Sequence, residues 1–290
     1  MKQAILITAY KDAKNICDIV NYLGEEFEFY IHIDKKSRLD LSEITGKKYT
    51  NVHVFQKYNV YWGSVNHLKS ILFLSNKAIQ DKRNVFFHLI TGQDLPIKTK
   101  DFFISSLDIT KDYLEYFEVP SPSWEGNGGM DRFRYYLPYE IFNYRNVIGR
   151  KIITALKTIQ KTLRIDRTPC NIFHQLYGGS TYWSLTRNSL QYVLEFTKKN
   201  TIFLKKMNYT FCSEEVYFQT ILLNSHCAKN VVNDNLRYTD WTTGRGGYPA
   251  FLDETDFVEI KKSNKLFARK FNEKYSTGVK ELIRTLIHRH

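Results

Sequence analysis

Apolar and polar positions in the first third of the chain follow two alternating periods. Four short apolar runs, rich in β-branched and aromatic residues, are typical of buried strands. They are Ala4–Ala9, Phe27–Ile33, Asn51–Phe55 and Val85–Ile90. Apolar residues at helical spacing separate them at Asn15–Leu23 and His67–Ile79. This alternation predicts an α/β fold, with a Rossmann-like, mostly parallel sheet flanked by helices.

Ligands of such sheets bind beyond the carboxyl ends of the strands. The pattern puts Asp34 and Asp94 there, because each follows a predicted strand. We see no internal repeat and no linker, so we expect one domain over residues 1–290. Within it, residues 1–118 would form a nucleotide-binding half. Residues 119–290 would form the acceptor and catalytic half, ending in a basic helix over about Thr277–Ile287.

The second half predicts a strand over Thr181–Leu185 and a helix over Ser213–Leu223, with Ser213 as its N-cap. Residues 149–167 predict a basic amphipathic helix. We interpret it as a surface helix that packs an apolar face on the core, and the alternative is a helix lying on an anionic membrane. The predicted apolar face comprises Ile152, Ile153, Leu156, Ile159 and Leu163.

Charge narrows the choice of ligand. The chain has 42 Lys and Arg against 30 Asp and Glu, a net charge of +12. This excess favours phosphate-bearing molecules, anionic lipid or nucleic acid. An aromatic-basic segment over Asp131–Tyr136 is the one candidate for nucleic-acid contact, and the scattered charge argues against that class.

Cysteine usage and hydropathy indicate a cytosolic protein. No apolar run reaches the roughly 20 residues of a membrane helix, and the N-terminus lacks the features of a signal peptide. Cys17, Cys170, Cys212 and Cys227 follow no framework, so we expect reduced thiols. Because Cys–His ligand spacing is absent, we expect no metal site.

Several catalytic motifs are missing. The chain has no Gly-x-Gly-x-x-Gly, Walker, Gly-x-Ser-x-Gly or His-Glu-x-x-His motif, which argues against dehydrogenases, P-loop enzymes, α/β-hydrolases and zincins. It also lacks Asp-x-Asp, with which many sugar-nucleotide transferases hold a divalent ion. A bound diphosphate would therefore need cations of the chain itself. Arg245, Arg269 and Lys270 are candidates, with ordinary surface charge as the alternative.

Two neighbouring carboxylates, Glu214 and Glu215, precede an apolar helical segment. A carboxylate in a partly apolar environment has a raised pKa and serves as a general base. The alternative is that both residues favour the positive end of the helix dipole. Sequence alone leaves these two interpretations open.

Seven segments in this order resemble one family. They are Ile31–Ser37, Trp62–Ser64, Thr91–Lys98, Gly178–Ser180, Glu214–Leu222, Asp234–Trp241 and Leu266–Phe271. Their order and content resemble the core-2/I-branching β-1,6-N-acetylglucosaminyltransferases and peptide O-xylosyltransferases, which form glycosyltransferase family 14. The resemblance extends over about residues 4–272, and residues 119–170 have no clear counterpart.

The resemblance implies a GT-A type fold and an inverting, metal-independent transferase without a cofactor, whose substrate is a UDP-sugar. It implies that Ile7 and Asp34 contact uracil and ribose, and that Lys270 binds the diphosphate with Arg245 or Arg269. Glu215, rather than Glu214, matches the catalytic base. The matching residues of the sugar and acceptor pocket are Trp62, Asp94, Gly179, Ser180 and Trp241.

The resulting hypothesis is a bacterial cytoplasmic enzyme that transfers GlcNAc or xylose to a glycan hydroxyl during surface-polysaccharide synthesis. A lipid-linked acceptor would bring the basic helices to the inner face of the cell membrane. Two alternatives belong to other classes. One is an inactive relative that binds glycans or nucleotides, and the less favoured one is a basic nucleic-acid-binding protein.

Overall fold

A mostly parallel sheet forms the centre of the computed structural model, which describes residues 1–46, 49–167 and 172–288. Its seven strands within these ranges are β1 (Lys2–Ala9), β2 (Phe27–Ile33), β3 (Val52–Phe55), β4 (Asn84–Thr91), β6 (Asp112–Leu114), β9 (Trp183–Thr186) and β10 (Val231–Val232). Their spatial order is β10-β6-β9-β4-β1-β2-β3. Neighbouring β4, β1, β2 and β3 are parallel, so their carboxyl ends share one edge. The predicted α/β class is confirmed.

The two predicted halves of the chain are interleaved in this architecture. Strand β9, from the second half, pairs antiparallel with both β4 and β6. A smaller sheet joins β5 (Asp94–Pro96) to β12 (Phe267–Arg269) and β11 (Arg237–Thr239). A third sheet pairs β7 (Phe117–Val119) with β8 (Leu176–Gly178). Segments far apart in sequence therefore meet at the edge where the strands end.

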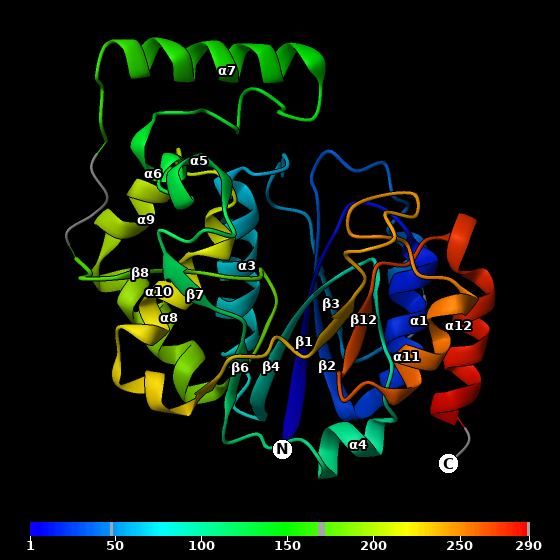
Figure 1. The fold of residues 1–290 in the computed structure, drawn as a ribbon. Helices are drawn as coiled ribbons and strands as arrows, with labels where there is room; N and C mark the ends of the chain where they lie inside the picture. The colour runs from blue at the N-terminus through cyan, green and yellow to red at the C-terminus, as the bar shows by residue number, and fades with distance from the viewer. Residues whose placement is uncertain (47–48, 168–171, 289–290) are drawn as a thin grey trace.

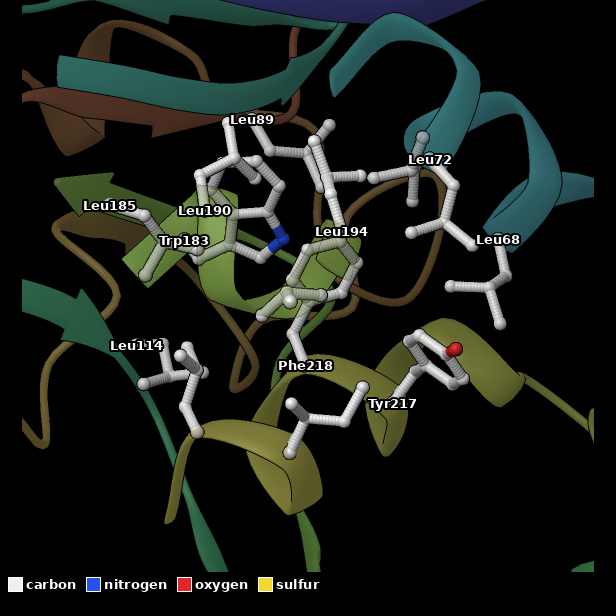
Figure 2. Close-up of a cluster of buried hydrophobic side chains, with 14 of the residues drawn as sticks. Leu68, Leu72, Leu89, Leu114, Trp183, Leu185, Leu190, Leu194, Tyr217 and Phe218 are labelled. Carbon is white, nitrogen blue, oxygen red and sulfur yellow. The ribbon is translucent and has the colours of Figure 1, made fainter. Parts of the chain in front are cut away.

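Both faces of the central sheet are buried. Successive side chains of a strand point to opposite faces. Ala4 and Leu6 of β1 accordingly belong to one apolar cluster, and Ile5 and Ile7 belong to another. This explains why β1 is a continuous apolar run, as central strands covered on both faces are. Figure 2 shows the first cluster, in which Trp183 lies among leucines from several elements.

Helices cover the two faces (Figure 1). The first cluster includes residues of α3 (Val65–Ala78), α8 (Arg187–Lys199), α9 (Thr201–Met207) and α10 (Tyr217–Leu223). The second includes residues of α1 (Ala13–Leu23), α2 (Ser42–Thr45), α4 (Lys100–Ser105), α11 (Phe257–Lys262) and α12 (Glu273–His288). The C-terminal helix α12 buries Val279, Ile283 and Ile287, so its apolar stripe is a core face. Within the described ranges, no helix combines the length and apolar character needed to cross a bilayer.

The predicted helix over Ser213–Leu223 is wrong at its start. Residues Ser213–Glu215 form a 3-10 turn, η2, and α10 begins only at Tyr217. Val216 leaves the helical region with φ −129°, and the Glu215 carbonyl accepts a hydrogen bond from Gly179 N–H at 2.9 Å. Ser213 does not cap α10, because the break between the two segments separates it from the helix.

The predicted helix over 149–167 is α7, which spans Val147–Thr162. It ends early because the chain turns at Arg164, which has φ +54°. Gly149, Ile153 and Gln160 are buried, but Ile159 and Leu163 remain 54% and 65% exposed. The expected packing is therefore only partly right. Figure 1 shows α7 lying across one end of the molecule beyond two short helices, α5 (Glu125–Gly128) and α6 (Asp131–Arg134).

Candidate active site

The carboxyl edge of β1, β2 and β4 contains the predicted nucleotide contact Asp34. Its carboxylate accepts hydrogen bonds from the backbone N–H of Lys36 at 3.0 Å and of Val60 at 3.1 Å. It also pairs with the Lys36 ammonium, which lies 4.5 Å from the ring centroid of Tyr61. These contacts fix the side chain at the end of β2, where a ligand of the sheet would bind.

Ile7 does not reach this edge. Its side chain is fully buried in the second apolar cluster, between β2 and β4. The side chain is therefore not available to a ligand at this edge, and the expected contact of Ile7 with uracil stays a prediction. Thr8 and Ala9, which follow Ile7 and end β1, lie nearer the strand end.

Glu215 closes η2 and is 28% exposed at its side chain. One carboxylate oxygen forms an ion pair with Arg132 Nη1 at 2.7 Å. Burial raises the pKa of Glu215, Arg132 opposes that rise, and the neighbouring Glu214 adds to it. A partly exposed carboxylate whose pKa is moved toward neutrality has the properties of a general base.

Arg132 was not predicted as a member of this site. Its guanidinium carbon lies 3.6 Å from the ring centroid of Trp124, so it is stacked on indole while it contacts Glu215. In the sequence it belongs to the aromatic-basic segment 131–136. Phe133 and Tyr135 of that segment are buried, so the segment does not present an exposed aromatic row. Because Arg132 and Glu215 are 83 positions apart in the sequence, no local pattern indicates their contact.

The predicted residues Gly179 and Ser180 lie beside Glu215. The N–H of Gly179 donates to the Glu215 carbonyl at 2.9 Å. A Cβ at position 179 would lie 1.9 Å from the carbonyl oxygen of Glu115, so only glycine fits. The Ser180 carbonyl accepts a hydrogen bond from Gln219 of α10 at 2.6 Å. The Gly-Gly-Ser segment therefore supports the turn that bears the carboxylate.

Glu214 points away from Arg132 and toward α3. Its Oε1 lies 2.9 Å from His67 Nδ1, and His67 Nε2 lies 3.1 Å from the Thr8 hydroxyl. The two neighbouring carboxylates thus have different partners. Neither His67 nor Thr8 was singled out from the sequence, where nothing marks them as neighbours of Glu214.

Arg269 is the last residue of β12 and Lys270 follows it; their expected contact with a diphosphate stays a prediction. Burial lowers the pKa of Lys270, and the nearby charges of Arg269, Arg145 and Lys11 lower it further. The Lys270 ammonium also lies 4.5 Å from the ring centroid of Phe251. Four cations from three segments therefore gather here, Arg269 among them paired with Asp94, and together they form an environment suited to a diphosphate. Arg145 and Lys11 were missed because they are isolated in the sequence.

Asp94 supports Arg269 instead of facing a ligand. Its side chain is fully buried, and it accepts hydrogen bonds from Thr91 N–H at 2.6 Å and from Arg269 Nε at 2.9 Å. The Arg269 guanidinium carbon lies 4.4 Å from the ring centroid of Tyr182. A contribution of Asp94 to the expected sugar pocket would therefore be indirect, through the residues that it holds, and it stays a prediction.

Arg245 has a different set of partners from those expected. Its guanidinium pairs with Asp253 at 2.9 Å and Asp256 at 2.7 Å, and it donates to the Phe251 carbonyl at 2.9 Å. These contacts clamp the loop that wraps around Lys270, where Gly247 and Phe251 lie close to the ammonium group. The side chain itself is engaged in the loop rather than directed to a diphosphate.

Two tryptophans of the expected sugar and acceptor pocket lie partly exposed in separate aromatic groups. Trp62 packs edge-on against Phe211 with 4.9 Å between ring centroids, and the Arg145 guanidinium carbon lies 5.3 Å from its ring centroid. Trp62 thus joins the cation cluster. Trp241 contacts Tyr248 at 5.2 Å instead. Across the described ranges, no three His, Cys, Asp or Glu residues gather as a metal site would require; Cys170 lies outside those ranges.

Comparison with known proteins identifies the relatives of this chain. Residues 6–266 match the family model described as Core-2/I-Branching enzyme. Xylosyltransferase 2 of Canis lupus familiaris is 25% identical over 286 residues, which cover 89% of this chain and 30% of the relative. Xylosyltransferase 1 of Homo sapiens is 25% identical over 226 residues, which cover 75% of this chain and 21% of the relative. This chain therefore spans less than a third of these relatives' length, and it belongs to the Core-2/I-branching enzyme family of glycosyltransferases.

Proposed function

We propose that this chain transfers a sugar from a UDP-sugar to a hydroxyl of a glycan acceptor, with inversion and without a metal ion. GlcNAc and xylose are the favoured sugars, because the family and its xylosyltransferase members transfer them. The observation that carries the proposal is that the family-matching segments contain a carboxylate whose pKa is raised, Glu215, and two cations, Arg269 and Lys270. The proposed acceptor is a bacterial surface glycan.

In the proposed reaction, Glu215 takes the proton of an acceptor hydroxyl. The hydroxyl oxygen forms a bond to the anomeric carbon from the face opposite UDP. The bond between that carbon and the β-phosphate oxygen breaks, and its electron pair leaves with UDP. One base suffices for this single displacement, which turns an α-linked donor into a β-linked product.

Negative charge grows on the diphosphate as the bond breaks. Lys270 and Arg269 stabilise that charge more in the transition state than in the bound substrate, and this difference is what accelerates the step. Asp94 and Tyr182 hold Arg269 in place, so the cation is preorganised. Arg132 keeps Glu215 ionised until a hydroxyl arrives, because it stabilises the charged form.

Calorimetry with UDP, UDP-GlcNAc and UDP-xylose in the presence of EDTA tests the proposal. We expect UDP to bind with EDTA present, and Lys270→Ala to weaken binding at least about tenfold, since a lost charge-assisted contact costs about 1.5–3 kcal/mol. Lys274→Ala is the matched control, because Lys274 is an exposed lysine nearby. Absence of binding to all three nucleotides would contradict the proposal, as would binding that EDTA abolishes.

The proposal extends to a lipid-linked acceptor and contact with the inner face of the membrane. Helix α7 carries no acidic residue, and Arg150, Lys151 and Lys161 are exposed on it. Beside them Ile148 is 73% exposed, and Ile159 lies on the same side at helical spacing. An amphipathic helix with this composition binds anionic lipid. Figure 1 shows α7 at the end toward which β1 runs, which is the end of the candidate site.

Flotation with phosphatidylglycerol-containing and pure phosphatidylcholine vesicles tests this extension. We expect salt-sensitive binding to the anionic vesicles only, lost in the double variant Ile148→Ser and Ile159→Ser. Ile104→Ser is the control, because Ile104 is as exposed as Ile159, at 54%, but belongs to α4 at the opposite end of the molecule. Equal behaviour of the two variants would argue against α7 as the contact surface.

A further inference from the structure

Three side chains from distant segments form a hydrogen-bonded chain beside the candidate base. Thr8 is the last but one residue of β1, His67 lies in the first turn of α3, and Glu214 lies in η2. The Thr8 hydroxyl is 3.1 Å from His67 Nε2, and Glu214 Oε1 is 2.9 Å from His67 Nδ1. Because a carboxylate only accepts, Nδ1 donates to Glu214, and Nε2 either accepts from the hydroxyl or donates to it.

The surroundings of Thr8, His67 and Glu214 make their hydrogen-bonded arrangement destabilising if it serves the fold alone. The Glu214 side chain is only 5% exposed and that of His67 21%. The second carboxylate oxygen of Glu214 is buried and finds no hydrogen-bond partner among the described residues. Burying a carboxylate with half of its acceptors unsatisfied destabilises the fold, and an apolar side chain would avoid that cost. Such features are typical of residues that serve function.

The position of Glu214 links the chain to the candidate base. Glu214 directly precedes Glu215 in a turn of three residues, and hydrogen bonds fix the backbone of Glu215 on both its N–H and its carbonyl side. Glu215 N–H donates to the Cys212 carbonyl at 3.0 Å, and its carbonyl accepts from Gly179. Holding Glu214 toward α3 therefore directs Glu215 to the opposite side, toward Arg132.

We propose that Thr8, His67 and Glu214 act as positioning residues for Glu215, and that the charges of the His67–Glu214 pair set how readily Glu215 takes up a proton. The inference rests on the proposed function for its catalytic meaning, because Glu215 is the base in that function. The arrangement itself, and the titration that tests it, do not depend on any acceptor or donor.

The groups that face this pair come from every neighbouring element. Arg132 of α6 pairs with Glu215, and the buried thiol of Cys212 precedes η2. On the other side, His32 of β2 lies near His67; burial lowers the pKa of His32 to about 4, so it is neutral near pH 7. The charges acting on Glu215 are therefore those of Arg132, Glu214 and His67.

The proposal is testable because Glu214 and His67 act on the pKa of Glu215 in opposite directions. The Glu214 carboxylate raises the pKa of Glu215, whereas a charged His67 lowers it. Removing the negative charge with Glu214→Gln must therefore lower the pKa of Glu215. Removing the positive charge with His67→Gln, which keeps a hydrogen-bonding amide, must raise it. A role confined to packing gives no reason for shifts of opposite direction.

The experiment is a carbon-13 NMR titration of full-length protein labelled at glutamate carboxyls, with the Glu215 signal assigned by its loss in Glu215→Gln. We expect Glu214→Gln and His67→Gln to shift the Glu215 midpoint in opposite directions, because the two side chains carry opposite charges. Glu140→Gln is the control, because Glu140 also contacts α3, by accepting from Val65 N–H, and is not among the charges named as acting on Glu215. In Glu140→Gln, the titration midpoint of Glu215 should match that of the wild type.

Shifts in one direction, or midpoints that match the wild type in both variants, would overturn the proposal. If either variant fails to fold, the wild-type protein supplies a second test. The Glu215 signal must then show a further inflection at the pH where the His67 ring signals titrate, and its absence counts against the coupling. The activity of Glu215→Gln is measured separately from the titration. A finding that Glu215 is not the base would therefore leave the test of the coupling between Glu215, Glu214 and His67 unaffected.

Discussion

The carboxylate of Glu215 is the single group on which the proposed chemistry depends. We expect Glu215→Gln to lower transfer or donor hydrolysis by about 10²–10⁴-fold, the usual contribution of a general base. UDP affinity should be unchanged, because the carboxylate pairs with Arg132 and not with the cations near β12. Turnover assays and UDP calorimetry on the same protein check both parts. Near wild-type turnover would show that another group takes the proton.

The charge state of Lys270 gives a pH dependence of known direction. Burial and neighbouring cations lower its pKa below the usual lysine value, whereas a bound diphosphate favours the charged form. UDP should therefore bind tightly below the lowered pKa and lose affinity as the pH rises through it.

Calorimetry of UDP binding between about pH 7 and pH 10 measures this loss. In Lys270→Arg the side chain stays charged over the whole range, so affinity should fall much less. The same alkaline loss in both proteins would assign the titration to another group. Lys270 would then contribute no more than position and shape to the nucleotide site.

At the scale of elements, the turn Gly178–Ser180 holds η2 in place. A Cβ at Gly179 would lie 1.9 Å from the Glu115 carbonyl oxygen. We expect Gly179→Ala to lower the free energy of unfolding by about 1–3 kcal/mol, as overpacking does, and to lower turnover by displacing Glu215. Denaturant unfolding and activity assays measure the two effects.

Gly244→Ala is the comparison for that prediction. Gly244 has φ +62° and no atom within 4 Å of an added Cβ, so alanine there meets strain without a clash. It should cost about 1–2 kcal/mol and leave turnover intact. If Gly179→Ala retains full turnover, the turn is needed for the fold alone.

Helix α7 shows what element-scale patterns leave open. Its apolar spacing correctly predicted a helix near residue 149, yet two residues expected on the buried face, Ile159 and Leu163, are exposed. Periodicity indicates that an apolar stripe exists. It does not tell how much of that stripe neighbouring elements cover, since this depends on segments elsewhere in the chain.

At the scale of the whole molecule, the interleaved halves predict a single unfolding event. Strand β9 lies between β4 and β6, and β12 pairs with β5, so neither half completes its sheets without strands of the other. Tryptophan fluorescence, which reports on buried Trp183, and far-ultraviolet circular dichroism should give coincident urea transitions. Two separated transitions would mean that the halves fold independently.

Bound UDP should shift the single unfolding transition to higher urea concentration, by the same amount in fluorescence and in circular dichroism. At a UDP concentration of 100 times its dissociation constant, we expect about 2.7 kcal/mol of added stability by mass action. Because the nucleotide site draws on β2 and on the segment after β12, both probes should shift together. A shift seen by only one of the two probes would mean that UDP stabilises only one half of the chain.

The sequence by itself determined the α/β class and the positions of five of the seven strands that the described residues contribute to the central sheet. These strands rest on local periodicity, which the chain displays directly. Local motifs offered Gly179, Lys270 and the pair Glu214 and Glu215 as candidates, and only the family resemblance chose Glu215 from that pair. The turn at η2 escaped prediction, because a hydrogen bond from Gly179 competes there with the helical pattern of Ser213–Leu223.

Tertiary structure alone decided which charges meet. It joined Arg132 to Glu215, His67 to Glu214, and Arg145 to the surroundings of Lys270, across separations that no local pattern spans. It also turned Arg245 and Asp94 toward structural partners. Ionic contacts depend on the distance between side chains in space, which the folded sheet and its connections set.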